Sequence, residues 1–285
     1  MDLQTLKYFC AVAAEGSLSK AAQKLHYAQS NLSTKIMQLE QDMGTTLFYR
    51  NSHGVSLTPK GETLLKYATN LINLAEEVTI VMKDDGLAKG TLKIGSMEST
   101  VISYLSKFLA TFHEEKPEIA VKIETGTTDA LLEKVLEHKL DGAFVAGPIK
   151  HSELFTKQVK SEKLCIIASR KLLKRPDLDA ALKEPLLVFP SGCSYRKILE
   201  NLMQKKGFVI NKIYEFTTLS AIFASVTAGL GIALFPESAI KQYTEASSLT
   251  ITKLPEKQGT VSTVFVYRKD SYLSSAMCNF INSIK

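Results

Sequence analysis

The chain has 285 residues, of which 45% are hydrophobic, so it is long enough for two or three domains with real apolar cores. It contains no apolar run of about 18 residues, which excludes a membrane span, and its first residues lack the apolar core of a signal peptide, so we expect a cytoplasmic protein. The net charge of +6 lies entirely beyond residue 90, because the first 90 residues hold nine basic and nine acidic side chains, and this excess suits either an anionic small ligand or a solvated surface.

The first predicted elements are three short helices within residues 3–43. The first runs over 3–14 and ends at Gly16, and Ser17 is a suitable N-cap for the second. Apolar residues recur at the helical spacing of three and four positions in the other two, at Leu18, Ala21, Ala22 and Leu25, and then at Leu32, Ile36, Leu39 and Met43. The brief turn between these two helices, residues 26–28, indicates a helix-turn-helix.

Side chains at the start of the third helix are suited to reading DNA. A helix that enters the major groove reaches base edges with its N-terminal residues, and its free N–H groups can hold a phosphate. Gln29 can pair with adenine through two hydrogen bonds. A short β wing over residues 45–58 would bring Arg50 and His53 to phosphate or to the minor groove. We therefore expect DNA contacts from Gln29, Ser30, Asn31, Ser33, Thr34, Lys35, Arg50 and His53.

A long helix is expected to begin at Pro59, since proline favours the first helical turn, and to end at a hinge within residues 84–90. Its apolar positions follow heptad spacing, which forms a seam of Leu64, Ala68, Leu71, Ala75, Val78 and Met82. Packing against the same chain would give this pattern too. The regular heptad spacing directly follows a DNA-binding head, which favours a coiled coil with a second copy of the chain. We therefore expect dimerisation through this helix.

From Thr91 onward strands and helices alternate, which predicts parallel sheets covered by helices. Strands are expected at 91–96, 119–126, 142–147, 186–190, 213–217, 232–236 and 259–268, with extended segments between 149 and 169. Helices are expected at 99–112, 128–140, 194–206, 219–229, from 237, and at 271–284. In open sheets of this kind a ligand binds at the carboxyl ends of the strands.

Polar side chains gather at several of these strand-to-helix turns. Ser99 or Thr100 would present a hydroxyl beside free helix N–H groups, which suits an anion, whereas Glu98 in the same turn would repel one. Arg196 could pair with a ligand carboxylate or form a structural salt bridge, and each hydroxyl could instead cap its helix. The candidate ligand-binding residues are Ser96, Glu98, Ser99, Thr100, Thr127, Thr128, Ser191, Ser194, Tyr195, Arg196, Thr217 and Thr218.

Residues 16–61 resemble the winged helix-turn-helix of LysR-type transcriptional regulators. The resemblance rests on Ala21-Ala22, Leu25, Gln29-Ser30, Leu32-Ser33, Ile36, Leu39-Glu40, Gly44, Leu47-Phe48, Arg50, Leu57-Thr58 and Gly61. The sequence departs from the family at Ala28, where Ser or Thr is frequent, and at Thr34, where Arg is frequent. A capping hydroxyl and one strong phosphate or guanine contact are therefore absent, and Lys35 compensates only in part.

The rest of the chain resembles the effector domain of the same family, which has two lobes like a periplasmic binding protein. The shared motifs are Leu92-x-Ile94-Gly95, Phe108-x3-Phe112-x4-Pro117, Leu140-Asp141-Gly142-Ala143 and Ala228-Gly229-x-Gly231-Ile232-Ala233-x2-Pro236. The resemblance implies an N-terminal all-α winged helix-turn-helix domain with a long dimerisation helix, and a C-terminal α/β two-lobed effector domain. The implied boundaries are 1–58 for the DNA-binding domain, 59–90 for the linker helix and hinge, and 91–285 for the effector domain, with lobe I at 91–161 plus 269–285 and lobe II at 162–268.

Enzymatic and redox interpretations find little support in the residues. The chain lacks Gly-x-Ser-x-Gly, a P-loop and Gly-x-Gly-x-x-Gly, so we do not expect an enzyme. Its four cysteines have no metal-ligand or disulfide spacing, so we expect neither a metal nor a cofactor. Redox regulators of the family have two nearby cysteines, whereas Cys193 and Cys278 are far apart, and Cys193 is expected to be a small buried thiol.

These features predict a sequence-specific transcriptional regulator of the LysR type, controlled by a small-molecule effector, with an anionic metabolite as one candidate. It would bind operator DNA as a homodimer or homotetramer, and would also contact RNA polymerase if it activates transcription. The alternative is a ligand-binding protein that uses the two-lobed half alone, and the helix-turn-helix argues against it.

Overall fold

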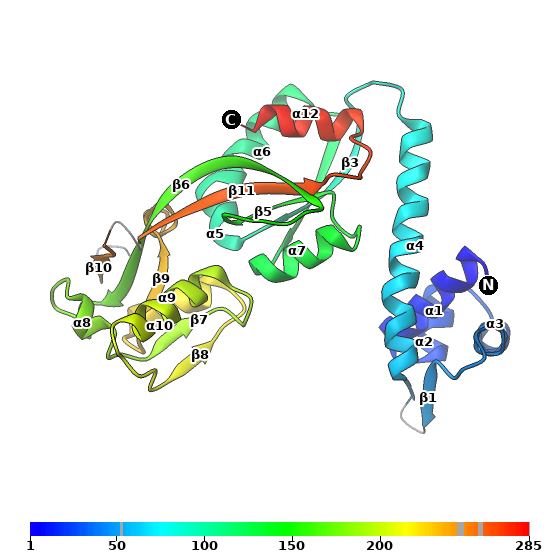
Figure 1. Ribbon diagram of the computed structural model, residues 1–285, viewed down its shortest axis with the longest axis horizontal. Coiled ribbons are helices and arrows are strands. Elements are labelled where there is room, and N and C mark those ends of the chain that lie inside the picture. Colours follow the sequence, from blue (N-terminus) through cyan, green and yellow to red (C-terminus); the bar gives the residue numbers. More distant parts are fainter. Residues whose placement is uncertain (52–53, 244–247, 256–258, 285) are drawn as a thin grey trace. The chain divides into compact units, whose positions relative to one another are not determined.

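The computed structural model describes residues 1–51, 54–243, 248–255 and 259–284. The chain divides into two compact units, one made of Met1–Asp84 with Glu137–Lys139 and the other of Asp85–Leu136 with Leu140–Lys285. Figure 1 follows the chain through both units, from blue at the N-terminus to red at the C-terminus. Within the described ranges, no helix combines the length and the apolar character that crossing a membrane requires.

The first unit begins with a small helical head. It contains α1 (Leu3–Glu15), α2 (Leu18–Lys24), α3 (Gln29–Met43), β1 (Phe48–Asn51) and β2 (Gly54–Leu57). Gly16 ends α1 in the left-handed conformation, with φ of 59°, which glycine adopts without steric cost. The Ser17 side chain then caps α2 by accepting from Lys20 N. Apolar faces of the three helices meet in one core that includes Leu6, Phe9, Leu32, Ile36 and Leu39.

The long helix α4 (Pro59–Lys83) starts against the wing. Thr58 caps it by accepting from Gly61 N, and a Cβ atom at Gly61 would lie 2.2 Å from the Leu47 carbonyl oxygen. Only glycine therefore lets the start of α4 approach the head this closely. The wing is the antiparallel pair β1–β2, with Arg50 opposite Val55. Ser52 and His53 lie outside the described residues, so the predicted contact from His53 stays a prediction.

The apolar side chains of α4 divide between two faces, which corrects the predicted seam. Ala68 is fully buried and Leu64 partly buried in the core of the head, together with Leu65 and Ile72, so these positions already have partners in their own chain. The exposed apolar stripe consists of Tyr67, Leu71, Leu74, Val78 and Met82. Ala75 is half-buried. The part of the helix that remains available to a second copy is therefore displaced around the helix from the predicted line.

The second unit contains a sheet of seven strands, in which six follow the order β10-β6-β11-β5-β3-β4 and β9 also pairs with β6. In lobe I, β3 (Gly90–Ser96) lies parallel to both β4 (Ile119–Thr125) and β5 (Gly142–Gly147). Helices α6 (Ser106–Glu115) and α12 (Ser275–Ser283) share one apolar core with this sheet, and α7 (Thr128–Leu136) shares another. The parallel β/α arrangement that the alternation predicted is therefore present.

Lobe II is reached by two strands that extend beyond lobe I. β6 (Leu154–Ser169) pairs with β11 (Thr260–Arg268) over its first part and with β9 (Ala233–Pro236) and β10 (Leu249–Lys253) over its last. The lobe also contains the parallel pair β7 (Leu186–Val188) and β8 (Ile213–Glu215). Its helices are α8 (Leu178–Ala181), α9 (Ser194–Lys205), α10 (Leu219–Ala228) and α11 (Glu237–Ile240).

Several helix boundaries differ from those expected. The helix expected at 99–112 consists of α5 (Glu98–Thr100), a π-helical turn η1 (Val101–Leu105) and α6. Ser106 Oγ donates to the Val101 carbonyl at 2.8 Å, and a hydroxyl that binds a carbonyl five residues back stabilises the wider turn. The last helix starts at Ser275 rather than at 271, because the Ser274 hydroxyl caps it by accepting from Met277 N. The segment from 237 forms only a single helical turn.

Candidate functional site

The start of α3 presents a row of accessible polar side chains. Gln29, Ser30, Asn31, Thr34 and Lys35 are exposed, while Ser33 is half-buried. Gln29 Oε1 accepts from Ser19 Oγ at 3.0 Å, which orients the amide, and the second lone pair of this oxygen stays available. Ala28 provides no side-chain cap to α3, as its sequence predicts. The first N–H groups of α3 can therefore bind a phosphate oxygen.

Glu40, whose role the sequence analysis missed, joins α3 to the wing. Its Oε1 accepts from Leu47 N at 2.8 Å and from Phe48 N at 3.2 Å, and its Oε2 accepts from Arg50 Nη2 at 3.1 Å. The Arg50 side chain is 39% exposed, so it remains accessible to DNA while this ion pair directs it. Glu40 thus positions both the start of β1 and the guanidinium.

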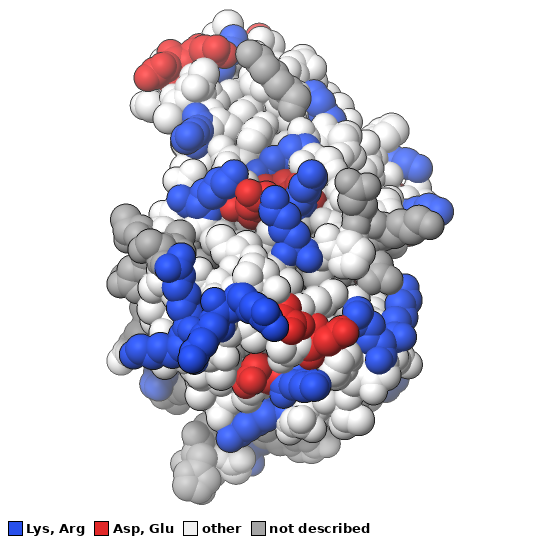
Figure 2. Space-filling model, turned by 90° about the vertical axis from the view of Figure 1, so that its left-hand side faces the viewer, with Lys and Arg blue, Asp and Glu red and all other residues white. Residues whose placement is uncertain are grey.

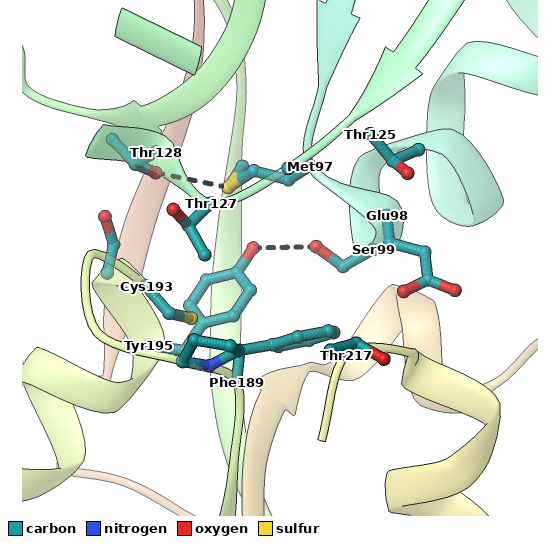
Figure 3. Close-up of a pocket in the computed structure, with 13 residues that line it drawn as sticks. Met97, Glu98, Ser99, Thr125, Thr127, Thr128, Phe189, Cys193, Tyr195 and Thr217 are labelled. Atoms are coloured by element: carbon teal, nitrogen blue, oxygen red, sulfur yellow. Dashed lines mark hydrogen bonds between the residues drawn. The ribbon is translucent and has the colours of Figure 1, made fainter. Parts of the chain in front are cut away.

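A cavity of about 200 Å³ lies between the two lobes of the second unit (Figure 3). A cavity of this size suits a small metabolite. Lobe I contributes residues from the turns after β3 and β4, and lobe II contributes residues from the turns after β7 and β8. The lining consists of Met97, Glu98, Ser99, Thr125, Gly126, Thr127, Thr128, Phe189, Pro190, Cys193, Ser194, Tyr195 and Thr217.

Polar contacts join the lobes around this cavity. Ser99 Oγ lies 3.1 Å from the hydroxyl of Tyr195, and Glu98 Oε2 accepts from Leu219 N at 2.8 Å. Lys197 Nζ donates to Asp129 at 2.7 Å, and Asp129 N donates to the Gly192 carbonyl at 3.3 Å. A molecule in the cavity therefore lies beside Glu98, Ser99 and Tyr195, and can strengthen or replace the contacts that these residues make between the lobes.

Burial controls the protonation of two groups in the cavity wall. Tyr195 is 4% exposed, and desolvation raises the pKa of its hydroxyl well above the usual range, although the hydrogen bond to Ser99 opposes this shift. Desolvation likewise raises the pKa of the Cys193 thiol. Cys193 is therefore a protonated, buried thiol at neutral pH, which is a poor nucleophile toward oxidants.

Seven of the twelve predicted ligand-binding residues line the cavity, and five do not. Ser96 is buried and donates to the Met97 carbonyl, Thr100 is buried inside lobe I, and Ser191 is exposed. Thr218 caps α10 by accepting from Ala221 N. These positions correct the expectation that every polar group at these turns faces the ligand, since Ser96 and Thr100 are buried, Ser191 is exposed and Thr218 caps its own helix.

Arg196 also lies outside the cavity lining, which corrects its expected pairing with a ligand carboxylate. Its guanidinium donates to Glu200 at 2.7 Å, to Glu215 at 2.6 Å and to the Phe189 carbonyl at 3.3 Å. Hydrogen bonds to these two carboxylates raise the pKa of Arg196 further above its ordinary value. The structural salt bridge is therefore the role that the structure supports.

The basic excess of the chain lies on the surface of lobe II. Residues 162–268 contain fifteen Lys or Arg and nine Asp or Glu. Figure 2 faces this end of the effector unit and shows blue side chains spread over it, with red ones interspersed. Part of this charge is paired, as in the contact of 2.7 Å between Lys206 and Asp179. Because no basic residue is among the described residues that line the cavity, the net charge is a solvated surface feature.

Family models match the chain over both units. Residues 3–62 match the bacterial regulatory helix-turn-helix protein of the lysR family, and residues 85–285 match the LysR substrate binding domain. The chain belongs to the LysR family. It is a DNA-binding transcriptional regulator with an effector-binding domain, and both the predicted family and the predicted fold class are confirmed.

Full-length relatives extend this assignment. The HTH-type transcriptional regulator CzcR of Bacillus thuringiensis subsp. konkukian (strain 97-27) is 39% identical over 285 residues, which covers 100% of this chain and 97% of that protein. Among solved structures, the LysR family regulator CbnR is similar with a TM-score of 0.75 at 21% identity, covering 100% of this chain and 98% of that one. CbnR in complex with its target DNA gives a TM-score of 0.74 at 22% identity, covering 100% and 99%.

Sequence reasoning overlooked six lining residues of this LysR regulator, namely Met97, Thr125, Gly126, Phe189, Pro190 and Cys193. Thr125 and Gly126 directly precede the predicted Thr127, so the turn was identified but its extent was not. Met97, Phe189 and Pro190 are apolar residues at strand ends, and such residues usually belong to a core. Their position at the carboxyl ends of two strands was the available signal, because ligand pockets are mostly apolar.

Proposed function

We propose that this LysR regulator reads an operator with the start of α3 and the wing, and that a small molecule in the interlobe cavity changes its affinity for that operator. The observation that carries the proposal is that the cavity is lined by both lobes and bordered by contacts between them. A ligand that binds one spacing of the lobes better than another shifts the population toward it. Its binding is then linked to any DNA-binding difference between those states.

The uncovered stripe of α4 supports pairing with a second copy. Its apolar side chains follow spacings of four, three and four positions at Tyr67, Leu71, Leu74 and Val78. A pair joined in this way would hold two heads on two half-sites of operator DNA in the cytoplasm. A tetramer would require a second contact between pairs, and RNA polymerase is the further partner of an activating complex.

Replacing Gln29 with alanine should reduce discrimination at one base pair of the operator by about 1–3 kcal/mol, which is the contribution of a paired base contact. Competition binding with operators altered at single positions measures this loss. Gln38, an exposed glutamine nine residues further along α3 and therefore on its opposite face, provides the matched control. Gln38→Ala should change affinity by no more than about 0.5 kcal/mol. Unchanged affinity and unchanged base preference in Gln29→Ala would exclude Gln29 as a reading residue.

Filling the cavity should uncouple the effector from DNA. Ser194 is half-buried at the start of α9 and lines the cavity, so Ser194→Trp would occupy ligand space inside the effector unit. For the wild-type chain, the low-molecular-weight fraction of a cell extract should shift the affinity for DNA upstream of its own gene in an electrophoretic assay. Ser194→Trp should bind the same DNA without this response, while circular dichroism verifies that it is folded. An equal response in both proteins would place effector control outside the cavity.

A further inference from the structure

We propose that the effector of this regulator is a small organic cation, an ammonium group carried on a compact apolar body, and that Glu98 binds its charge. This inference rests on the proposed function, because it names the chemical class that the same cavity accepts. Glu98 is the one charged side chain among the described residues that line the cavity. An anionic effector would have to place its charge in this cavity beside that carboxylate.

The Glu98 carboxylate is held in place and retains capacity for a ligand. Its Oε2 accepts from Leu219 N at 2.8 Å, which fixes the side chain across the lobes. An ionised carboxylate offers about four lone-pair sites, so one backbone donor leaves room for an ammonium. In Figure 3 the carboxylate lies at the same side of the cavity as the hydroxyl of Thr217. Hydroxyl groups nearby can accept the remaining ammonium hydrogens.

Positive charge that would attract an anion is engaged elsewhere. The Arg196 guanidinium is bound by Glu200 and Glu215, and the Lys197 ammonium by Asp129. The start of α10 is capped by Glu98 and Thr218, and the start of α7 donates to the Gly192 carbonyl and to Thr127 Oγ1.

Two helix starts at the cavity have no side-chain cap, that of α9 and that of α5, whose first residue is Glu98 itself. A helix N-terminus acts as about half of a positive charge. Glu98 lies in the first turn of α5 and offsets these partial charges, so the one full charge among the described lining residues is negative. The remaining cavity wall supplies apolar contact from Met97, Phe189 and Pro190 for the body of the ligand.

Three probes of matched shape and different charge test the proposal at neutral pH: benzylammonium, benzyl alcohol and benzoate. Isothermal titration of the full chain should show that benzylammonium binds about tenfold more tightly than benzyl alcohol. Both groups can donate a hydrogen bond to the Glu98 carboxylate, but only the ammonium adds attraction between opposite charges. Benzoate should bind more weakly than the alcohol. Ser194→Trp should lose all binding of benzylammonium, which locates the probe in the cavity.

The charge assignment is tested by Glu98→Gln. The amide oxygen of glutamine can still accept from Leu219 N, so the variant should fold and bind benzyl alcohol normally while the preference for benzylammonium disappears. Glu133→Gln, at an exposed position of α7 outside the lining, should retain the wild-type order.

The possible outcomes separate this proposal from the proposed function. Benzoate as the tightest probe, equal preference in wild type and Glu98→Gln, or no binding of benzylammonium at millimolar concentration would each overturn the cation assignment. Control of the operator by the cavity would stand in those cases, because the response of Ser194→Trp to cell extract tests it separately. Conversely, the expected probe order with an unaltered extract response in Ser194→Trp would retain the cation site and reject the regulatory role.

Discussion

Leu71→Lys should dissociate the paired regulator and remove operator binding at concentrations where the wild-type chain is bound. Leu71 is 44% exposed at the centre of the uncovered stripe of α4, between Tyr67 and Val78. Burying one leucine contributes about 1.5–3 kcal/mol, and a symmetric pair loses two of them. The dimer dissociation constant should therefore rise at least about 100-fold. A dissociated monomer can also no longer bind both half-sites of the operator at the same time.

A matched substitution on the same helix tests whether position decides the effect. Ile80 is 48% exposed and follows Leu71 by nine residues, about two and a half turns, which places it on the opposite side of α4. Ile80→Lys should leave the sedimentation coefficient and the operator affinity close to those of the wild type. A Leu71→Lys protein that still sediments as a dimer joined through α4, or equal damage from both variants, would contradict pairing through this stripe.

The α4 stripe illustrates what helical periodicity can and cannot predict. The spacing of apolar residues correctly predicted one long helix, and part of its apolar face packs against the head of the same chain. The periodicity could not assign each residue to a use, because Leu64, Ala68, Leu71 and Val78 satisfy a single heptad pattern. The core of the head decides the division, since Ala68 is fully buried there while Val78 is 55% exposed. Burial of this kind depends on the tertiary structure. It shifts the stripe of α4 that a second copy could contact toward Tyr67 and Leu74.

The topology of the fold was sufficient to predict which turns line the cavity. Alternating strands and helices indicated which turns lie at the carboxyl ends of the strands, and Ser99, Thr127, Tyr195 and Thr217 are all found in the cavity wall. The chemistry of the site was harder to predict. Glu200 lies four residues after Arg196 on one helix, so their pairing was visible in the sequence, whereas Glu215 reaches Arg196 only through the fold. Once both carboxylates bind the guanidinium, the charge expected for an anion is no longer available.

The contacts that hold the wing were likewise only partly predictable from the sequence. The sequence correctly predicted a β wing that carries Arg50. It did not indicate that Glu40, from the fourth turn of α3, would accept from two backbone N–H groups of the wing as well as from Arg50. Contacts between residues ten positions apart on different elements follow from packing, and no local pattern encodes them.

Phe280→Ala should remove about 3–5 kcal/mol from the free energy of unfolding of the effector unit, the cost of deleting a buried phenylalanine side chain. Phe280 is fully buried on α12, and its ring lies 5.2 Å from those of Phe108 and Phe112, with nearly perpendicular planes. It also lies 5.7 Å from the ring of Phe265. The last helix of the chain thus closes the core of lobe I, and its loss would loosen one wall of the cavity.

Urea unfolding of the full chain, followed by circular dichroism, measures this effect. The transition of the effector unit should shift to clearly lower urea in Phe280→Ala, because typical domains have only about 5–15 kcal/mol of stability. Phe155 provides the control, since it is 48% exposed on β6 and packs mainly on Tyr267. Phe155→Ala should cost about 1 kcal/mol or less. Equal midpoints for the two variants would show that α12 does not close lobe I. If instead Phe280→Ala alone is destabilised, its effector binding should weaken as well, because the turn after β3 that carries Glu98 and Ser99 packs through η1 and α6 onto the same aromatic core.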